Sequence, residues 1–302
     1  MAALDDMRKL LNRHARPDMS TAIDGIRVCK FTPSGASVAG MSGTVLAVIA
    51  QGGKRLALGE RLYEYRSGEY LIASADLPVT GHVLDTGDTG QPTLGFGMTL
   101  APRALAELLL EADPRDLPAT PRTTSPGIAV STASSPLLDA IVRLLRLLEQ
   151  PADRKILAPM VKREILWHLL RGEQGAAIRQ LGLADSALAH INRAVRQIRE
   201  NYATALRVED LADIAGMSVS AFHRNFQTVT GMSPIQFQKR IRLQEARLLL
   251  AGRPSDITGV GLSVGYASPS QFSREYRRMF GTPPSKDIHL RTPPAELVTA
   301  LP

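Results

Sequence analysis

The sequence is short of the residues that build disulfide frameworks, zinc centres and membrane spans. Its 302 residues include one cysteine, Cys29, which excludes an internal disulfide and any zinc site made from several cysteines. We expect Cys29 to be a small buried residue, with a redox sensor as the alternative. No run approaches the ~20 apolar residues of a membrane span, and residues 1–16 are charged where a signal peptide is apolar. These absences predict a cytoplasmic protein.

Signatures of catalysis are scarce as well. Residues 26–100 contain a single histidine, His82, whereas a catalytic metal site of histidines and a carboxylate needs several ligands. The chain has no P-loop. We therefore expect no enzyme activity, no metal and no cofactor. An enzyme built on the N-terminal part is the alternative, which a turnover assay with added iron or zinc would expose.

Positive charge is concentrated in one part of the chain. Residues 186–291 hold 15 Lys and Arg against 8 Asp and Glu, whereas the remainder holds 21 of each. The whole net charge of +7 therefore belongs to this C-terminal part. Such an asymmetry favours a polyanionic partner, because Lys and Arg gain affinity by displacing counterions from phosphates. A basic surface that merely keeps the protein soluble is the alternative.

The N-terminal part alternates short β-rich runs with glycine turns. A helix is expected over residues 4–14, and residues 26–100 are broken by Gly52-Gly53, Gly59-Glu60 and Ser67-Gly68. Short strands joined by tight glycine turns are typical of an antiparallel sandwich or a small barrel. We predict a small β-barrel with flanking helices. Lys54 and Arg55 follow the first of these turns and are expected to be solvated, with recognition of an anionic effector as the alternative.

Helical patterns follow the β-rich region. Pro102 opens a helix to about Glu111, and a Pro-rich and Thr-rich connector spans residues 113–126. Apolar residues over 137–148 and, less regularly, over 156–169 form stripes on two helices. These helices either pack on their own domain or form a face for a homodimer. Residues 172–182 are expected to be a hinge between domains.

The same helix-turn-helix unit occurs twice after residue 186. In the first copy, residues 208–215 form a short helix, Gly216-Met217-Ser218 the turn, and residues 218–228 a second helix. A long helix over 234–250 follows, and the second copy pairs residues 257–264 with a helix that begins at Ser268 and ends at Gly281. Two heads joined by a rigid helix are expected to enter successive major-groove segments, about 34 Å apart.

The outward faces of the second helix of each copy carry the candidate DNA contacts. Phe222 and Phe226 in the first copy, and Phe272 and Tyr276 in the second, have the spacing of core residues. Base edges are expected to be read from the opposite faces by Ser220, His223, Arg224, Ser270, Gln271 and Arg274. Phosphates are expected to be held by Gln227, Arg277 and Arg278.

At these residues the chain resembles a known family. Residues 268–284, SPSQFSREYRRMFGTPP, resemble the signature of AraC-type regulators, and residues 231–234, GMSP, are the matching mark after the first head. The resemblance covers about residues 190 to 290. It implies a transcription regulator that binds double-stranded DNA, acts as an activator and has RNA polymerase as a candidate partner. A protein-interaction adaptor that has lost DNA binding is the alternative.

The N-terminal part is similar to the cupin-like sensors of the same family. The matching residues are VIAQGGKR at 48–55, GEYL at 68–71 and ADLPVTG at 75–81, in the same order over about 80 positions. Relatives in this subgroup are often associated with genes for alcohol or aldehyde oxidoreductases. The resemblance implies an α+β chain in which residues 1–182 sense a small effector, residues 183–291 bind DNA and residues 292–302 form a tail.

An effector is expected in the interior of the predicted barrel. Aromatic and thioether side chains there combine apolar bulk with hydroxyls suited to a small organic molecule, although an ordinary core uses the same residues. The candidate effector-binding residues are Tyr63, Tyr65, Tyr70, Phe96 and Met98.

Overall fold

The computed structural model describes residues 2–32, 37–84, 90–118, 124–253 and 255–287. The predicted tail at 292–302 lies outside these ranges. The N-terminal half holds α1 (Ala2–His14), β1 (Ile26–Phe31), β2 (Val38–Met41), β3 (Val45–Gln51), β4 (Gly53–Leu58), β5 (Arg61–Arg66), β6 (Glu69–Ala73), β7 (Pro78–Val83), β8 (Thr93–Thr99) and β9 (Ile128–Thr132). Its helices are α2 (Pro102–Glu111), α3 (Ser135–Arg146), α4 (Pro151–Arg171) and α5 (Gly175–Gly182), with short 3-10 turns at Pro114–Asp116 and Leu147–Glu149.

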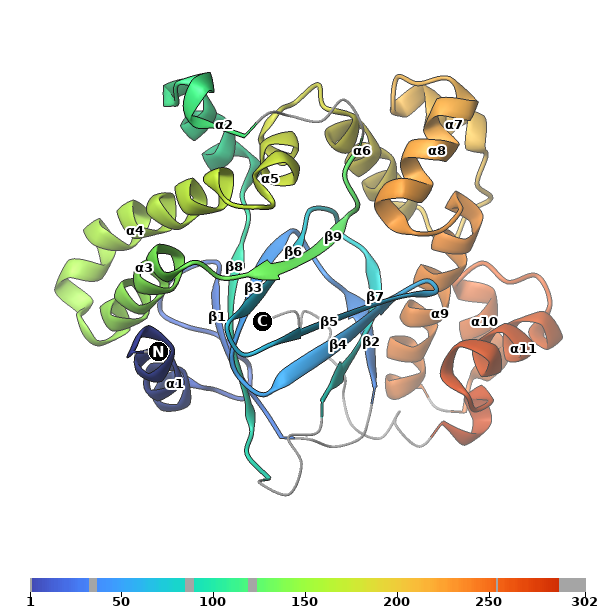
Figure 1. Cartoon of the computed structure of the whole chain (residues 1–302). Helices are drawn as coiled ribbons and strands as arrows, with labels where there is room; N and C mark the ends of the chain where they lie inside the picture. Colours follow the sequence, from blue (N-terminus) through green and yellow to red (C-terminus); the bar gives the residue numbers. More distant parts are fainter. Residues whose placement is uncertain (1, 33–36, 85–89, 119–123, 254, 288–302) are drawn as a thin grey trace.

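The strands form two antiparallel sheets that pack on one another (Figure 1). One sheet has the order β1-β8-β3-β6-β9 and the other the order β2-β7-β4-β5. The α+β class and the β-rich fold of the predicted sensor are confirmed, and its strands form two sheets instead of a closed barrel. Between the strands that the structure describes, no ladder joins the edges of the two sheets, so the hydrogen bonding does not close into a ring.

Two glycine turns are corners between the sheets rather than hairpins. Gly52 has φ +76° and separates β3, in the first sheet, from β4, in the second. A Cβ at this position would lie 2.3 Å from the Thr93 hydroxyl oxygen, so both the backbone and the packing require glycine. Gly68, with φ +84°, returns the chain from β5 to β6. Only Gly59, between β4 and β5, belongs to a hairpin.

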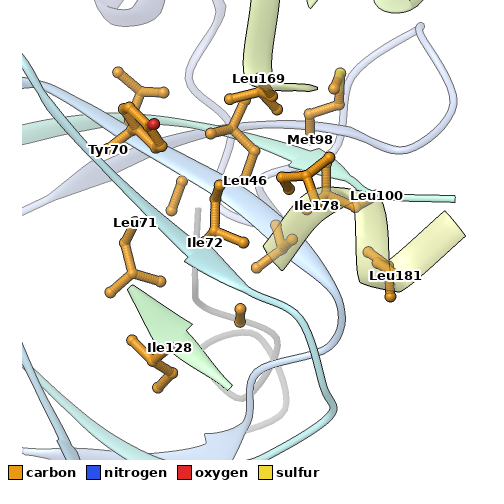
Figure 2. Close-up of a cluster of buried hydrophobic side chains, with 14 of the residues drawn as sticks. Leu46, Tyr70, Leu71, Ile72, Met98, Leu100, Ile128, Leu169, Ile178 and Leu181 are labelled. Atoms are coloured by element: carbon orange, nitrogen blue, oxygen red, sulfur yellow. The ribbon is translucent and has the colours of Figure 1, made fainter. Parts of the chain in front are cut away.

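Helices cover the outer face of the five-stranded sheet. α1 contacts β1, β3 and β8, and α3 packs between α1 and α4, so the apolar stripe of α3 is buried within its own domain. Figure 2 shows Leu46, Ile72 and Met98 of the sheet close to Leu169 of α4 and Ile178 of α5. Because Ile178 and its helix are part of this packing, the expected hinge at residues 172–182 is wrong: the segment contains α5, which contacts α2, α4 and α6.

The C-terminal half is helical throughout its described ranges. Its elements are α6 (Ala187–Glu200), α7 (Val208–Ile214), α8 (Val219–Thr230), α9 (Pro234–Gly252), α10 (Ile257–Ser263), α11 (Pro269–Phe280) and a 3-10 turn at Pro284–Lys286. Figure 1 shows α7 with α8 and α10 with α11 near opposite ends of α9. The two predicted helix-turn-helix units are confirmed. None of the described helices is long and apolar enough to cross a membrane.

The apolar core is divided unequally between the two heads. Buried residues of the first head, including Phe222, Phe226 and Phe237, belong to one cluster with the core of the sensor. The second head has its own cluster around Phe272 and Tyr276. The first head and the sensor therefore share a core, whereas the second head has a separate core that it forms with residues of α9 and with Tyr202 of the loop before α7.

Candidate DNA-binding interface

The first head presents one polar face of α8 to solvent. Ser218 caps this helix by accepting a hydrogen bond from the Ala221 backbone N–H at 3.3 Å, and Gly231 ends it with φ +71°. The rings of Phe222 and Phe226 are buried with their centroids 5.3 Å apart. The side chains on the opposite face, all exposed, are the predicted Ser220, His223, Arg224 and Gln227.

The second head repeats this arrangement on α11. The Ser268 hydroxyl accepts from the Gln271 N–H at 3.4 Å, and Gly281 ends the helix with φ +79°. Phe272 and Tyr276 are buried, whereas the predicted Ser270, Arg274, Arg277 and Arg278 are exposed. Within the described ranges, no ion pair or hydrogen bond engages the guanidinium groups of Arg224, Arg274, Arg277 or Arg278. Both faces therefore carry positive charge that is not neutralised within the described chain.

Gln271 differs from the other predicted base contacts. It is partly buried, and its Nε2 donates to Oε1 of Glu275 at 3.1 Å. Glu275 also accepts from Lys239 Nζ at 2.7 Å and from the Tyr266 hydroxyl at 2.9 Å. These donors hold the pKa of Glu275 below its ordinary value, although its partial burial opposes them. Gln271 is thus held in one orientation before any DNA arrives, a role that the sequence pattern did not reveal.

Basic residues of α9 support the fold instead of facing DNA. The Arg242 guanidinium donates to the carbonyl oxygens of Tyr202, Thr204 and Gly265 at 2.7, 2.8 and 2.8 Å. Arg247 forms an ion pair with the buried Asp287 at 3.0 Å. These contacts tie the loop before α7 and the segment after α11 to α9, which makes α9 a rigid spacer between the heads.

The predicted effector residues do not lie together. Direct cross-strand partners share a face of a sheet, and the register Phe96 to Val48 to Tyr70 places Phe96 and Tyr70 on one face. This is the face that α4 and α5 cover, where Figure 2 shows Tyr70 and Met98. The prediction that Tyr70, Phe96 and Met98 line the space between the sheets is therefore wrong. Tyr63 and Tyr65 lie on the four-stranded sheet, Tyr63 partly and Tyr65 fully buried.

A polar group of residues is buried beside Tyr65. Lys54 is its direct cross-strand partner and is only 3% exposed, with Nζ 3.8 Å from the centroid of the Phe31 ring. Burial lowers the pKa of Lys54 to about 8 and raises the pKa of the nearby Cys29 thiol to about 11. The Tyr65 hydroxyl is buried without a hydrogen-bond partner among the described residues. The expectation that Lys54 is solvated is wrong, whereas Arg55 is exposed and pairs with Glu64.

Direct hydrogen bonds join the sensor to the first head and to α9. The Gly127 N–H donates to the Val229 carbonyl at 3.0 Å, and the Thr124 hydroxyl donates to Asn225 Oδ1 at 2.9 Å. Gln244 of α9 donates to the Val79 carbonyl at 3.3 Å. The contacting residues of α8 lie away from its exposed polar face, so the sensor holds the first head and leaves that face open.

Comparison with known proteins agrees with this architecture. Residues 22–177 match the family described as the AraC-type transcriptional regulator N-terminus, and residues 211–288 match a helix-turn-helix domain. The chain is 30% identical over 150 residues to the HTH-type transcriptional activator RhaS of Escherichia fergusonii, covering 49% of this chain and 52% of that protein. It is 31% identical over 158 residues to the virulence regulon transcriptional activator VirF of Yersinia enterocolitica, covering 50% and 56%. The chain thus spans about half the length of these curated relatives.

Solved structures share the fold of most of the chain. An apo form of ToxT from Vibrio cholerae, a single-substitution variant, covers 90% of this chain and 100% of its own with a TM-score of 0.56 and 11% identity. Wild-type ToxT with bound unsaturated fatty acid covers 88% and 95% with a TM-score of 0.55 and 11% identity. The sensor match alone spans more than half of the chain, and the helix-turn-helix match falls on the two heads. The chain belongs to the AraC-type transcriptional regulators.

Proposed function

We propose that this regulator recognises a specific operator by placing α8 and α11 in two successive segments of the major groove. The observation that carries this proposal is the pair of exposed polar faces, each with an arginine that has no partner in the described chain. A guanidinium group matches the two acceptors of guanine, so Arg224 and Arg274 would read bases together with Ser220, His223 and Ser270. Gln227, Arg277 and Arg278 would hold phosphates and so set the position of each helix.

Gln271 would read a base in one of two ways. It keeps its hydrogen bond to Glu275 and uses its amide oxygen, or it breaks that bond and uses the whole amide group. A bidentate contact with adenine needs the amide oxygen and an amide N–H, and Glu275 occupies one of the two N–H groups of Gln271. If Glu275 keeps the amide, Gln271 accepts a hydrogen bond, which suits the amino group of cytosine or adenine. The operator sequence under α11 distinguishes these two modes.

A small organic effector would set the activity of this regulator, which acts in the cytoplasm as an activator. Two activators among the relatives and a structural neighbour solved with a bound fatty acid support this part of the proposal. Tyr63 and Tyr65 remain candidates for effector contacts, and Lys54 joins them. RNA polymerase and a second copy of the chain are proposed partners. Genes for alcohol or aldehyde oxidoreductases are the proposed targets, a prediction that rests on the sequence resemblance.

Binding of the full chain to its own upstream intergenic DNA tests the central proposal. Fluorescence anisotropy would compare this DNA with a scrambled duplex over roughly 50 to 300 mM salt, since phosphate contacts weaken steeply as salt rises. Preference for the native duplex, with an affinity that falls with salt, is the expected result. No binding at any salt concentration would reject DNA recognition and favour the protein-interaction adaptor.

A further inference from the structure

A groove of about 750 Å³ lies between the sensor and α6, the first helix of the DNA-binding half. One wall comes from the segment before β3, the loop between β6 and β7, the end of β8, the first turns of α2 and the end of α5. The other wall comes from one side of α6. Small-molecule sites in proteins commonly enclose about 300–1,000 Å³, so the groove has the size of a binding site. Neither the family match nor the candidate effector residues assign a ligand to it.

The lining of this groove is strongly basic. It contains Arg103, Arg193, Arg196 and Arg199 but a single acidic residue, Asp76, which leaves a net charge of +3. Arg199 pairs with Asp76, and Arg103 pairs with Glu107 at 3.0 Å while remaining 92% exposed. No ion pair in the described part of the chain engages Arg196. The groove thus carries more positive charge than its own acidic residues neutralise.

The N-terminus of α2 adds to this positive potential. The helix has ten residues and begins with Pro102, and its N-cap residue Ala101 provides no side-chain hydrogen bond. The first backbone N–H groups of an uncapped helix attract anions, and the helix dipole has the same sign there. Because Pro102 and Arg103 line the groove, the dipole and the arginines act on the same space.

Much of the remaining lining is apolar, although Thr44, Thr99 and Asn192 also belong to it. Leu181 and Val195 are almost completely buried beneath the groove, and Ala106 and Ala189 continue the surface. An inorganic anion would leave this surface in contact with water. We propose that the groove binds an organic anion, a carboxylate with an apolar tail, whose charge lies among Arg103, Arg196 and Arg199.

Such a ligand would act on the contact between the two halves of the protein. Asp76 binds Arg199 of α6 and also accepts from the Gly43 backbone N–H at 2.9 Å. A carboxylate that binds Arg199 competes with Asp76 and changes the tie between sensor and α6. The ligand shifts the arrangement of the heads by as much as its affinity differs between the two states.

Binding is tested first without DNA, so that it does not depend on the proposed function. Isothermal titration of the full chain with octanoate, and with octan-1-ol as the uncharged match, would be compared with the variant Arg103→Gln/Arg196→Gln. Both residues are exposed, and the melting temperature of the variant shows whether it folds. The control variant Arg66→Gln/Arg115→Gln removes two exposed arginines elsewhere in the sensor.

We expect octanoate to bind the parent and the control variant with equal affinity, and to bind the groove variant with an affinity lower by roughly tenfold or more. The parent should bind octanoate more tightly than octan-1-ol. Equal octanoate affinity in the parent and the groove variant would overturn the proposal, as would equal affinity for the alcohol. Loss of DNA affinity in the groove variant without octanoate would overturn it too, because the arginines would then bind DNA phosphates. Octanoate binding by a parent that binds no DNA supports the groove and rejects the proposed function.

Discussion

At the scale of single residues, free charge separates DNA contacts from structural arginines. Arg242 and Arg247 are as basic as Arg224 and Arg274, yet the first two are bonded to carbonyl oxygens and to a buried carboxylate. The side chains of Arg224 and Arg274 have no such partner in the described chain. A guanidinium that is already bonded would have to give up those bonds to read a base, whereas a free one gives up only water.

Replacing Arg224 or Arg274 with Ala should weaken operator binding by about 1–3 kcal/mol for each lost base contact and relax specificity at one base pair. Anisotropy titrations with the operator, and with operators changed at single base pairs in the half-site of the affected head, measure the loss of affinity and the loss of specificity. Arg115→Ala removes another exposed arginine, from the sensor, and should change neither. Unchanged affinity in both head variants would show that the recognition faces are assigned wrongly.

Lys54 makes the stability of the sensor depend on pH. Its pKa is about 8 in the folded protein because of burial, against an ordinary value of 10.5. Below pH 8 the ammonium is charged in both states, so its burial costs up to about 3 kcal/mol. As pH rises from 8, the folded state loses its proton first, and this cost declines. Burial of the Cys29 thiol lowers stability as pH rises, but only above pH 9.0, the ordinary pKa of the thiol.

Lys54→Met should therefore stabilise the protein at pH 7 by about 1–3 kcal/mol and remove the gain in stability that the parent shows from about pH 7 to 9. Urea unfolding of both proteins at these two pH values measures the difference. Lys30→Met, at an exposed position that donates to Asn12, is the control and should follow the parent. The same change in unfolding free energy between the two pH values for the Lys54→Met variant and the parent would contradict the cost assigned to the buried ammonium.

At the scale of elements, the recognition helices are defined by their caps. Each begins after a serine whose hydroxyl accepts a backbone N–H and ends at a glycine with positive φ. These signals are local in sequence, and the 3.6-residue period of the aromatic residues fixes which side is buried. The start of both helices and, apart from Gln271, the exposed sets on them could therefore be predicted from the sequence alone.

The sensor was harder to predict, because pairing between strands is not local. Tyr65 and Tyr70 look alike in sequence, but the corner at Gly68 places them in different sheets. Burial of Lys54 also had no local signal, since its neighbour Arg55 is exposed. In the second head, Glu275 orients Gln271 and is itself held by Lys239, which lies 36 residues earlier on α9. Only the assembled structure brings these residues together.

The capping of α8 leads to a test that separates stability from recognition. Ser218→Ala removes the cap and should lower the free energy of unfolding by about 0.5–2 kcal/mol. Ser220→Ala, two residues later on the exposed face, should leave stability within about 0.5 kcal/mol of the parent and weaken operator binding instead. Urea unfolding and anisotropy on both variants decide the matter. An equal loss of unfolding free energy in the Ser218→Ala and Ser220→Ala variants would contradict the assignment of Ser218 as the cap.

At the scale of the whole molecule, the two heads are held in different ways. The first shares its core with the sensor and is bonded to it through Gly127 and Thr124. The second is attached through α9 and the residues that contact it, such as Arg247 and Asp287. A change in the sensor therefore reaches the first head directly and the second through α9 and the loop before α7.

Hydrogen exchange should reveal this division. Phe272→Ala is expected to cost about 3–5 kcal/mol locally and to reduce protection in α10 and α11 while sparing the sensor. Phe226→Ala removes a ring of similar size from the shared core and should reduce protection in α8 and in the sensor sheets together. Exchange measured by mass spectrometry across the full chain separates these patterns. Loss of sensor protection in the Phe272→Ala variant would contradict the separate core.

The separate core of the second head also bears on how such regulators diversify. Because this core lies apart from that of the sensor, α10 and α11 can be exchanged between relatives if the facing residues of α9 and the close contact of Gly265 with Ala203 are kept. Such a graft should produce a folded chimera that keeps the sensor of the recipient. The first head is different, because a Cβ at Gly127 would lie 2.4 Å from the Val229 carbonyl oxygen and Leu58 packs against Gly231. New operators are therefore expected to arise more readily through the half-site of the second head.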